Sequence, residues 1–209
     1  MIELNQNHFI GRGGTRACYL HPFDSDKCIK IDKRKSGGAT EREGRYYEKI
    51  ALIRPEFPYL HIPRFYGFVE TNLGRGGVFD LIRDETDGEI SKSFRDYILA
   101  GEVTVDHPLW INAYNEYMKE LYQQAIIIRD FNPGNICVRK KQDGAYQFIT
   151  IDGIGHRHAI PLCDYSRWFA RYTIKQHVNR KGFGSLSEIF NRIEDKKLKY
   201  QSMQTSEIH

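Results

Sequence analysis

The first 90 residues alternate short apolar runs with glycine- and proline-containing turns, which is typical of a strand-rich segment. A glycine turn joins the first two runs, so they predict a β-hairpin. The third run alternates polar and apolar residues, the period of a half-buried strand. Two more runs follow a proline-containing stretch. The five predicted strands cover residues 9–10, 17–20, 27–31, 64–69 and 77–82.

The hydrophobic period changes between the third and fourth predicted strands. One stripe recurs with the spacing i, i+3, i+4 and i+7, and it consists of Glu43, Tyr46, Tyr47 and Ile50. Residues with this spacing share one face of an α-helix. The pattern therefore predicts a helix over residues 39–53, inserted after the third strand.

The second half of the chain is mostly helical in pattern. Helices are predicted over residues 93–99, 108–124, 161–180 and 185–195. An irregular loop over residues 129–135 precedes two short apolar runs, 136–138 and 148–151, which predict a β-pair joined by a turn at 142–145. We expect the polar residues 201–209 to form a flexible tail.

Composition excludes several classes of protein. The 209 residues are 40% hydrophobic and include 13 Tyr and 12 Phe. This is enough apolar area to form a core, so the composition excludes a chain that is disordered throughout. The net charge of +4 permits an anionic ligand but does not favour nucleic acid. The chain has no apolar run of about 18 residues and no signal-peptide pattern at its start. We therefore expect a cytoplasmic protein without a transmembrane segment.

Cysteine and histidine spacing does not predict a metal-binding fold. The four cysteines, Cys18, Cys28, Cys137 and Cys163, are far apart and form no C-x-x-C pair. We expect reduced thiols, as in cytosolic proteins. The eight histidines are scattered as well, so a zinc site is not expected.

Two features of the strand-rich half point to phosphate binding. Gly11, Gly13 and Gly14 lie between two predicted strands, where glycine lets backbone amides approach a phosphate, although a plain hairpin turn has the same composition. Lys30 interrupts an apolar strand, and it faces either solvent or the interior. An inward lysine needs a buried carboxylate partner. Glu43 on the inner helical stripe is the best candidate, and Glu41 is the alternative.

The loop over residues 128–135 carries the most informative polar residues. Asp130 and Asn135 lie five positions apart, between a helix and a strand pair, and Asp152 ends the second strand of that pair. The three side chains are therefore expected to converge at one end of the β-pair. Oxygen ligands of this kind suit Mg²⁺, and a further carboxylate can accept or orient a hydroxyl proton. For the loop alone, turn capping by Asp and Asn is the competing explanation.

The order of these residues along the chain resembles the protein-kinase-like superfamily over about residues 8–155. A glycine loop is followed by a strand Lys, a helix Glu, a loop Asp, an Asn five residues later and a strand-end Asp. The segments 11–22, 28–31 and 42–47 look like the YrbL family, a small bacterial family linked by name to the PhoP regulatory network.

This resemblance implies an ATP- and Mg²⁺-dependent phosphotransferase. Lys30 matches the phosphate-binding lysine and Glu43 its helix partner, while Asp130 matches the catalytic aspartate. Asn135 and Asp152 match the metal ligands. The implied nucleotide contacts are Gly11, Gly13, Gly14, Lys30, Val78, Phe79, Asp80, Leu81 and Ile82.

Several residues depart from the kinase pattern. Arg16 replaces the third glycine of the loop, Ile128 replaces the usual His, and Asn132 replaces the lysine two positions after the aspartate. The D-F-G triplet becomes Asp152-Gly153-Ile154, and no A-P-E sequence follows. The arrangement Asp130-x-x-Pro133-x-Asn135 looks more like that of aminoglycoside, choline and lipopolysaccharide-core kinases.

The expected fold is α+β, a minimal two-lobed protein-kinase-like fold. Residues 1–88 would form an N-lobe with an antiparallel five-stranded sheet and one helix, and residues 89–200 a truncated, mostly helical C-lobe. The expected acceptor is a small-molecule, sugar or glycolipid hydroxyl. The alternatives are a pseudokinase-like regulatory module that binds nucleotide and a protein partner and, less favoured because the C-terminal part is short, a protein Ser/Thr kinase.

Overall fold

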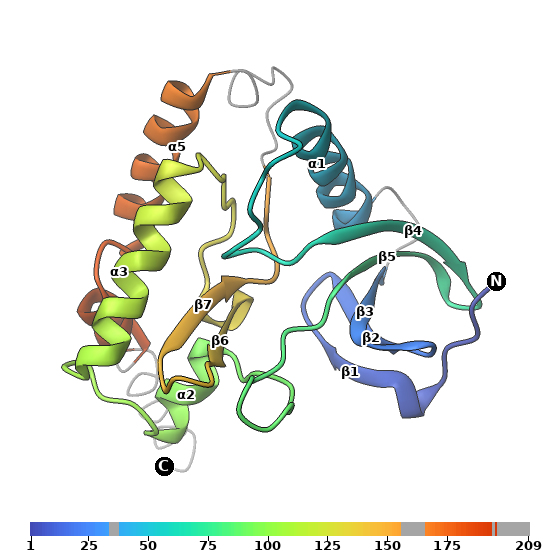
Figure 1. Cartoon of the computed structure of the whole chain (residues 1–209), viewed down its shortest axis with the longest axis horizontal. Helices are drawn as coiled ribbons and strands as arrows, with labels where there is room; N and C mark the ends of the chain where they lie inside the picture. The colour runs from blue at the N-terminus through green and yellow to red at the C-terminus, as the bar shows by residue number, and fades with distance from the viewer. Residues whose placement is uncertain (34–37, 156–165, 194, 196–209) are drawn as a thin grey trace, which may run out of the picture.

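The computed structural model describes residues 1–33, 38–155, 166–193 and 195. Its first half is an antiparallel sheet of five strands in the order β1-β2-β3-β5-β4 (Figure 1). The strands are β1 (Phe9–Arg12), β2 (Arg16–His21), β3 (Asp24–Asp32), β4 (Phe65–Thr71) and β5 (Gly74–Asp80). A short 3-10 helix, η1 (Gln6–His8), precedes them.

Helix α1 (Ala39–Ile53) packs on the sheet over β3, β4 and β5. The carboxylate of Asp32, at the end of β3, accepts hydrogen bonds from the backbone N and Oγ1 of Thr40 at 3.2 and 3.0 Å, which fixes the start of the helix. Gly44 lets the helix approach β4, because a Cβ at this position would lie 2.8 Å from Cζ of Phe65. The helix has the bounds that the hydrophobic stripe predicts.

The described residues of the second half form four helical segments and a small hairpin. The helices are α2 (Phe94–Ala100), α3 (Pro108–Gln123) and α5 (Arg167–Lys181), and residues 186–193 are also helical. The hairpin pairs β6 (Ile136–Lys140) with β7 (Tyr146–Thr150), and the 3-10 turn η2 (Pro133–Asn135) leads into it. The hairpin lies between helix α3 and the five-stranded sheet (Figure 1).

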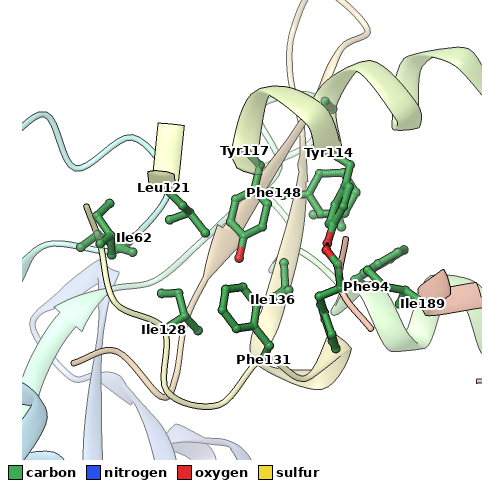
Figure 2. Packing of buried hydrophobic residues seen from close by; sticks show 14 of the residues in the cluster. Ile62, Phe94, Tyr114, Tyr117, Leu121, Ile128, Phe131, Ile136, Phe148 and Ile189 are labelled. Atoms are coloured by element: carbon green, nitrogen blue, oxygen red, sulfur yellow. Dashed lines mark hydrogen bonds between the residues drawn. The ribbon is translucent and has the colours of Figure 1, made fainter. Parts of the chain in front are cut away.

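Aromatic side chains dominate the core of the second half (Figure 2). The ring of Phe148 on β7 lies 5.1 Å from that of Phe94 and 5.4 Å from that of Trp110, measured between centroids. The buried hydroxyl of Tyr117 is satisfied, because it shares a 2.6 Å hydrogen bond with Oγ1 of Thr150. The same cluster continues to Tyr47 and Phe79 of the first half, so one apolar core connects the two halves.

The predicted fold class is confirmed: an antiparallel five-stranded sheet with one helix is followed by a mostly helical part. The predicted helix over 161–180 is observed from Arg167 onward, and residues 156–165 lie outside the described part. The expected tail over 201–209 also lies outside it, and the division into lobes at residue 88 stays a prediction. Within the described part, no helix is long and apolar enough to cross a membrane.

Candidate active site

A cavity of about 920 Å³ lies between the sheet and the hairpin β6–β7. Most residues predicted to form the site line it: Gly11, Gly13, Gly14, Lys30, Asp80, Leu81, Ile82, Asp130, Asn135 and Asp152. Three predicted residues, Glu43, Val78 and Phe79, do not. The convergence of Asp130, Asn135 and Asp152 on one space is therefore present in the structure.

The loop that carries Asp130 is held from both ends. Phe131, the next residue, is buried in the aromatic core and anchors the loop there. On the other side, the backbone N of Arg129 donates to the carbonyl of Gly153 at 2.8 Å. Gly153 has φ +79°, and a Cβ there would lie 2.9 Å from Cβ of Asp130. Glycine at this position thus allows the Asp130 and Asp152 segments to touch.

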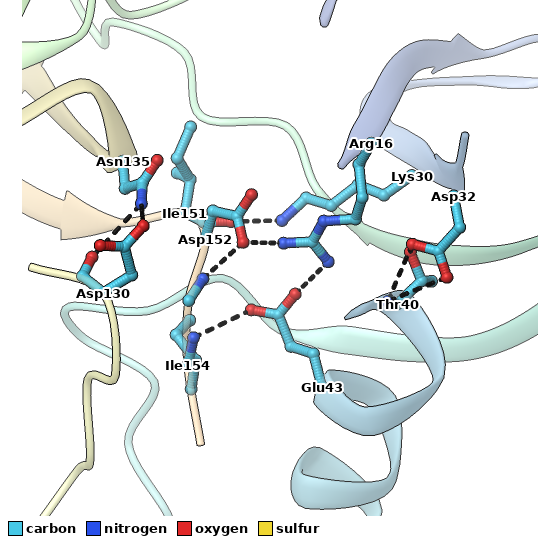
Figure 3. Close-up of polar contacts among 11 residues, drawn as sticks. Arg16, Lys30, Asp32, Thr40, Glu43, Asp130, Asn135, Ile151, Asp152 and Ile154 are labelled. Carbon is cyan, nitrogen blue, oxygen red and sulfur yellow. Dashed lines mark hydrogen bonds and ion pairs between the residues drawn. The ribbon is translucent and has the colours of Figure 1, made fainter. Parts of the chain in front are cut away.

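Asp130 and Asn135 contact each other directly. The Nδ2 atom of Asn135 donates to Oδ2 of Asp130 at 3.0 Å and to its carbonyl at 3.3 Å (Figure 3). Oδ1 of Asn135 has no hydrogen-bond partner among the described residues and is available to a ligand. The backbone of Asn135 is tied to the other strand, because its carbonyl accepts from the N of Ile151 at 2.8 Å.

Lys30 points inward, which resolves the choice left open by the sequence. It is 7% exposed and donates to the carbonyl of Ile151, and its Nζ lies 4.2 Å from the centre of the Phe79 ring. The alternating pleat of β3 explains this direction, because the neighbouring Ile29 and Ile31 belong to a separate apolar cluster on the opposite face. The ammonium group thus sits at the cavity wall beside Asp152.

The expected pairing of Lys30 with Glu43 is wrong for this structure. Both carboxylate oxygens of Glu43 are used elsewhere: Oε2 pairs with Arg16, and Oε1 accepts from the backbone N of Ile154 at 3.3 Å (Figure 3). Arg16 is the cause. It stands at the position of the missing third glycine, and its guanidinium takes the place beside Glu43 that Lys30 was expected to occupy. Glu43 is 3% exposed and does not reach the cavity.

Arg16 also pairs with Asp152, so one guanidinium contacts two carboxylates. Burial alone would lower the pKa of Arg16, but the charges of Glu43 and Asp152 raise it above its usual value. Oδ1 of Asp152 accepts both from Arg16 and from the backbone N of Gly153 at 2.5 Å. The side chain of Asp152 is 34% exposed, which leaves its second oxygen accessible from the cavity.

Val78 and Phe79 are absent from the cavity wall because they lie within β5, where both faces of the sheet are covered. Val78 packs with Leu4, Ile29 and Ile31, and Phe79 is fully buried in the main core. Of the predicted run from Val78 to Ile82, the residues that line the cavity are Asp80, at the end of β5, and Leu81 and Ile82, which follow it.

The donor atoms fit Mg²⁺ better than a softer metal. The described residues contain no group of three or more His, Cys, Asp or Glu side chains that would hold a metal by themselves. Asn135 and Asp152 supply two hard oxygens, and Mg²⁺ commonly takes one or two protein ligands and completes its shell with water and phosphate.

Three thiols at the cavity were not identified as site residues from the sequence. Cys18, Cys28 and Cys137 line the cavity from β2, β3 and β6, and all three are free. A hydrogen bond from Cys28 lowers the pKa of Cys18, while that bond and burial raise the pKa of Cys28. The signal was the shared strand face of Cys18, Cys28 and Lys30, which appears only once the strands are paired.

Solved structures similar in fold include the kinase domain of Mycobacterium tuberculosis PknI. The C20A_R136N double mutant of that domain matches with a TM-score of 0.48 and 15% identity, covering 73% of this chain and 61% of that one. The form without these substitutions gives a TM-score of 0.47, also at 15% identity, over 71% of this chain and 59% of that one. The chain thus spans less than two thirds of the length of these domains.

Two relatives found by sequence have a higher identity to this chain than the solved kinase domains have. YrbL of Escherichia coli (strain K12) and YrbL of Shigella flexneri are each 32% identical over 171 residues, which is 80% of this chain and 80% of each relative. The family described as PhoP regulatory network protein YrbL matches residues 2–181. The chain therefore belongs to the YrbL family.

Proposed function

We propose that the chain is an ATP- and Mg²⁺-dependent phosphotransferase that acts on the hydroxyl of a small molecule, sugar or glycolipid. The observation that carries this proposal is that Lys30, Asp130, Asn135 and Asp152 line a single cavity beneath the glycine turn. These side chains supply the groups that phosphoryl transfer needs: a cation for phosphate, oxygen ligands for Mg²⁺ and a carboxylate for the acceptor hydroxyl.

The lining of the cavity supports an anionic ligand with an apolar part. Its six cationic side chains (Arg12, Arg16, Lys30, Arg42, Arg95 and Arg129) outnumber its three acidic ones (Asp80, Asp130 and Asp152). Apolar side chains such as Ile10, Leu81 and Ile82 lie in the same wall and offer a surface for an adenine ring.

The glycine turn supports close approach of a ligand to the backbone. Gly11, Gly13 and Gly14 have no positive φ, and a Cβ added at any of them would meet nothing within 4 Å. Neither backbone conformation nor packing therefore requires glycine here. A phosphate group lying against the backbone amides gives a physical reason for the missing side chains.

In the proposed reaction, Lys30 neutralises charge on the bound phosphates and Asp130 orients the acceptor hydroxyl. The hydroxyl oxygen forms a bond to the γ-phosphorus, the bond to the bridging oxygen breaks, the hydroxyl proton passes to Asp130, and ADP leaves. Mg²⁺ held by Asn135 and Asp152 would offset the charge on the phosphate oxygens.

The space beside Asp130 supports a small acceptor group. A second cavity of about 130 Å³ shares Asp130 with the first, and Phe183, Ile189 and Arg192 lie in its wall. It has room for the hydroxyl-bearing end of an acceptor. We place the reaction in the cytoplasm.

A second function, a nucleotide-binding regulatory module with a protein partner, is favoured by one observation. Arg16 occupies one oxygen of Asp152, the proposed metal ligand.

ADP formation from ATP and Mg²⁺ distinguishes the two functions, with Asp130→Asn as the test variant. A phosphotransferase loses turnover in this variant and keeps nucleotide binding, whereas a binding module shows binding without turnover in both proteins.

A further inference from the structure

Arg16 joins three segments that are distant in the sequence. It begins β2, and its side chain, 4% exposed, reaches Glu43 on α1 and Asp152 after β7 (Figure 3). A guanidinium can contact two carboxylates at once because its donors are arranged in a rigid planar fork, and a lysine ammonium lacks this geometry. Arg16 is therefore a fixed part of the cavity wall.

The two oxygens of Asp152 have different surroundings. Oδ1 accepts from Arg16 and from the backbone of Gly153, whereas Oδ2 has no protein partner among the described residues. In Figure 3 this second oxygen points away from the guanidinium. A metal ion at Asp152 would therefore bind Oδ2 while Arg16 stays on Oδ1, with two cations sharing one carboxylate.

We infer that Arg16 is a positioning residue that fixes the Asp152 carboxylate and weakens its affinity for a free divalent cation. Like charges that share a carboxylate repel each other, so the metal binds well only when an anionic nucleotide adds negative charge to the site. The inference rests on the proposed metal site at Asp152. It explains why an arginine stands where a glycine would leave the carboxylate free.

The test is the affinity of the nucleotide-free protein for Mn²⁺, a paramagnetic substitute for Mg²⁺, measured by electron paramagnetic resonance. Arg16→Gln removes the charge and should tighten Mn²⁺ binding by about tenfold or more. Arg16→Lys loses the planar fork but keeps the charge, so it should not reproduce the gain in Mn²⁺ affinity. Adding Asp152→Asn to Arg16→Gln should abolish the gain, which locates it at that carboxylate.

Folding is controlled by a matched double variant. Arg16→Gln alone leaves Glu43 buried without its partner, so Arg16→Gln/Glu43→Gln removes both charges, and circular dichroism checks both proteins. Folded variants with unchanged or weaker Mn²⁺ affinity would overturn the inference. If the inference is overturned, the proposed function is still supported when the wild type binds Mn²⁺ in the presence of ATP and Asp152→Asn does not. Absence of this binding in the wild type would contradict the function and the inference together.

Discussion

The guanidinium of Arg16 forms an ion pair with the carboxylate of Glu43, and both side chains are 4% exposed. This pair takes the place of the lysine–glutamate pair that the motif order implies. It ties the sheet to α1, and through Ile154 it ties α1 to the segment that follows Asp152. The wall of the cavity is therefore held together by the guanidinium of Arg16, which stands where the kinase pattern has its third glycine.

Glu43→Ala should destabilise the protein. The change leaves part of a buried guanidinium uncompensated, so we expect the free energy of unfolding to fall by about 3 kcal/mol in urea denaturation. The matched control is Glu41→Ala on the same helix, whose pair with Arg45 is exposed and screened by solvent, so its loss of stability should be much smaller. Equal losses in the two variants would contradict a structural role for the buried pair.

Gly153→Ala should disturb the site beyond its effect on stability. A methyl group at this position collides with Asp130, so ATP turnover should fall sharply. The control is Gly144→Ala, since Gly144 has a similar φ of +82° but an open environment. Both variants should lose about 1–2 kcal/mol of stability from backbone strain. Only Gly153→Ala should lose turnover, and similar turnover in both would refute the contact argument.

Gly14→Ala should separate ligand binding from folding. No atom lies within 4 Å of the added methyl group, so stability should be unchanged or rise by up to about 1 kcal/mol. Affinity for Mg·ATP should decrease, because Gly14 lines the cavity and an added methyl group would keep a phosphate from the backbone of the glycine turn. Gly76→Ala is the reverse control: its Cβ would lie 2.6 Å from Cγ2 of Ile29, so it should destabilise by about 1–3 kcal/mol. Unchanged Mg·ATP affinity in Gly14→Ala would argue against a phosphate at the glycine turn.

Cys18 should be the most reactive of the three cavity thiols. Its pKa is lowered by the hydrogen bond with Cys28, while burial raises the pKa of Cys137 to about 12. Near neutral pH, iodoacetamide should therefore alkylate Cys18 faster than Cys137, with a rate that rises with pH until Cys18 is deprotonated. Bound Mg·ATP should slow the reaction at Cys18. Peptide mass spectrometry measures both rates, and an equal rate with and without nucleotide would place the ligand elsewhere.

Local pattern was enough to predict α1, the β6–β7 pair and the convergence of Asp130, Asn135 and Asp152. A hydrophobic stripe marks the buried face of α1, and two short apolar runs joined by a turn mark the β-pair. The three polar residues flank that pair in the sequence, so the pairing of its strands brings them together. The partner of Glu43 was not predictable in this way. Arg16 lies 27 residues before Glu43 and 136 before Asp152, so only the folded sheet shows that one side chain reaches both.

Val78 and Phe79 were expected to contact the nucleotide, but they do not line the cavity, and the reason is related. The sequence shows that this run is apolar, but it does not show that both faces of the strand are covered. Val78 is 4% exposed and Phe79 is 0% exposed, so neither has a surface left for a ligand. The strand end at Asp80 marks where contact with the cavity begins.

The most direct test of a Mg·nucleotide site in this cavity is a calorimetric titration with a non-hydrolysable ATP analogue and Mg²⁺. We predict that the wild type binds it and that Lys30→Met loses the binding. Lys27→Met should keep it, because Lys27 lies on the same strand but pairs with Asp24 outside the cavity. No binding by the wild type, or equal binding by Lys30→Met, would contradict the account.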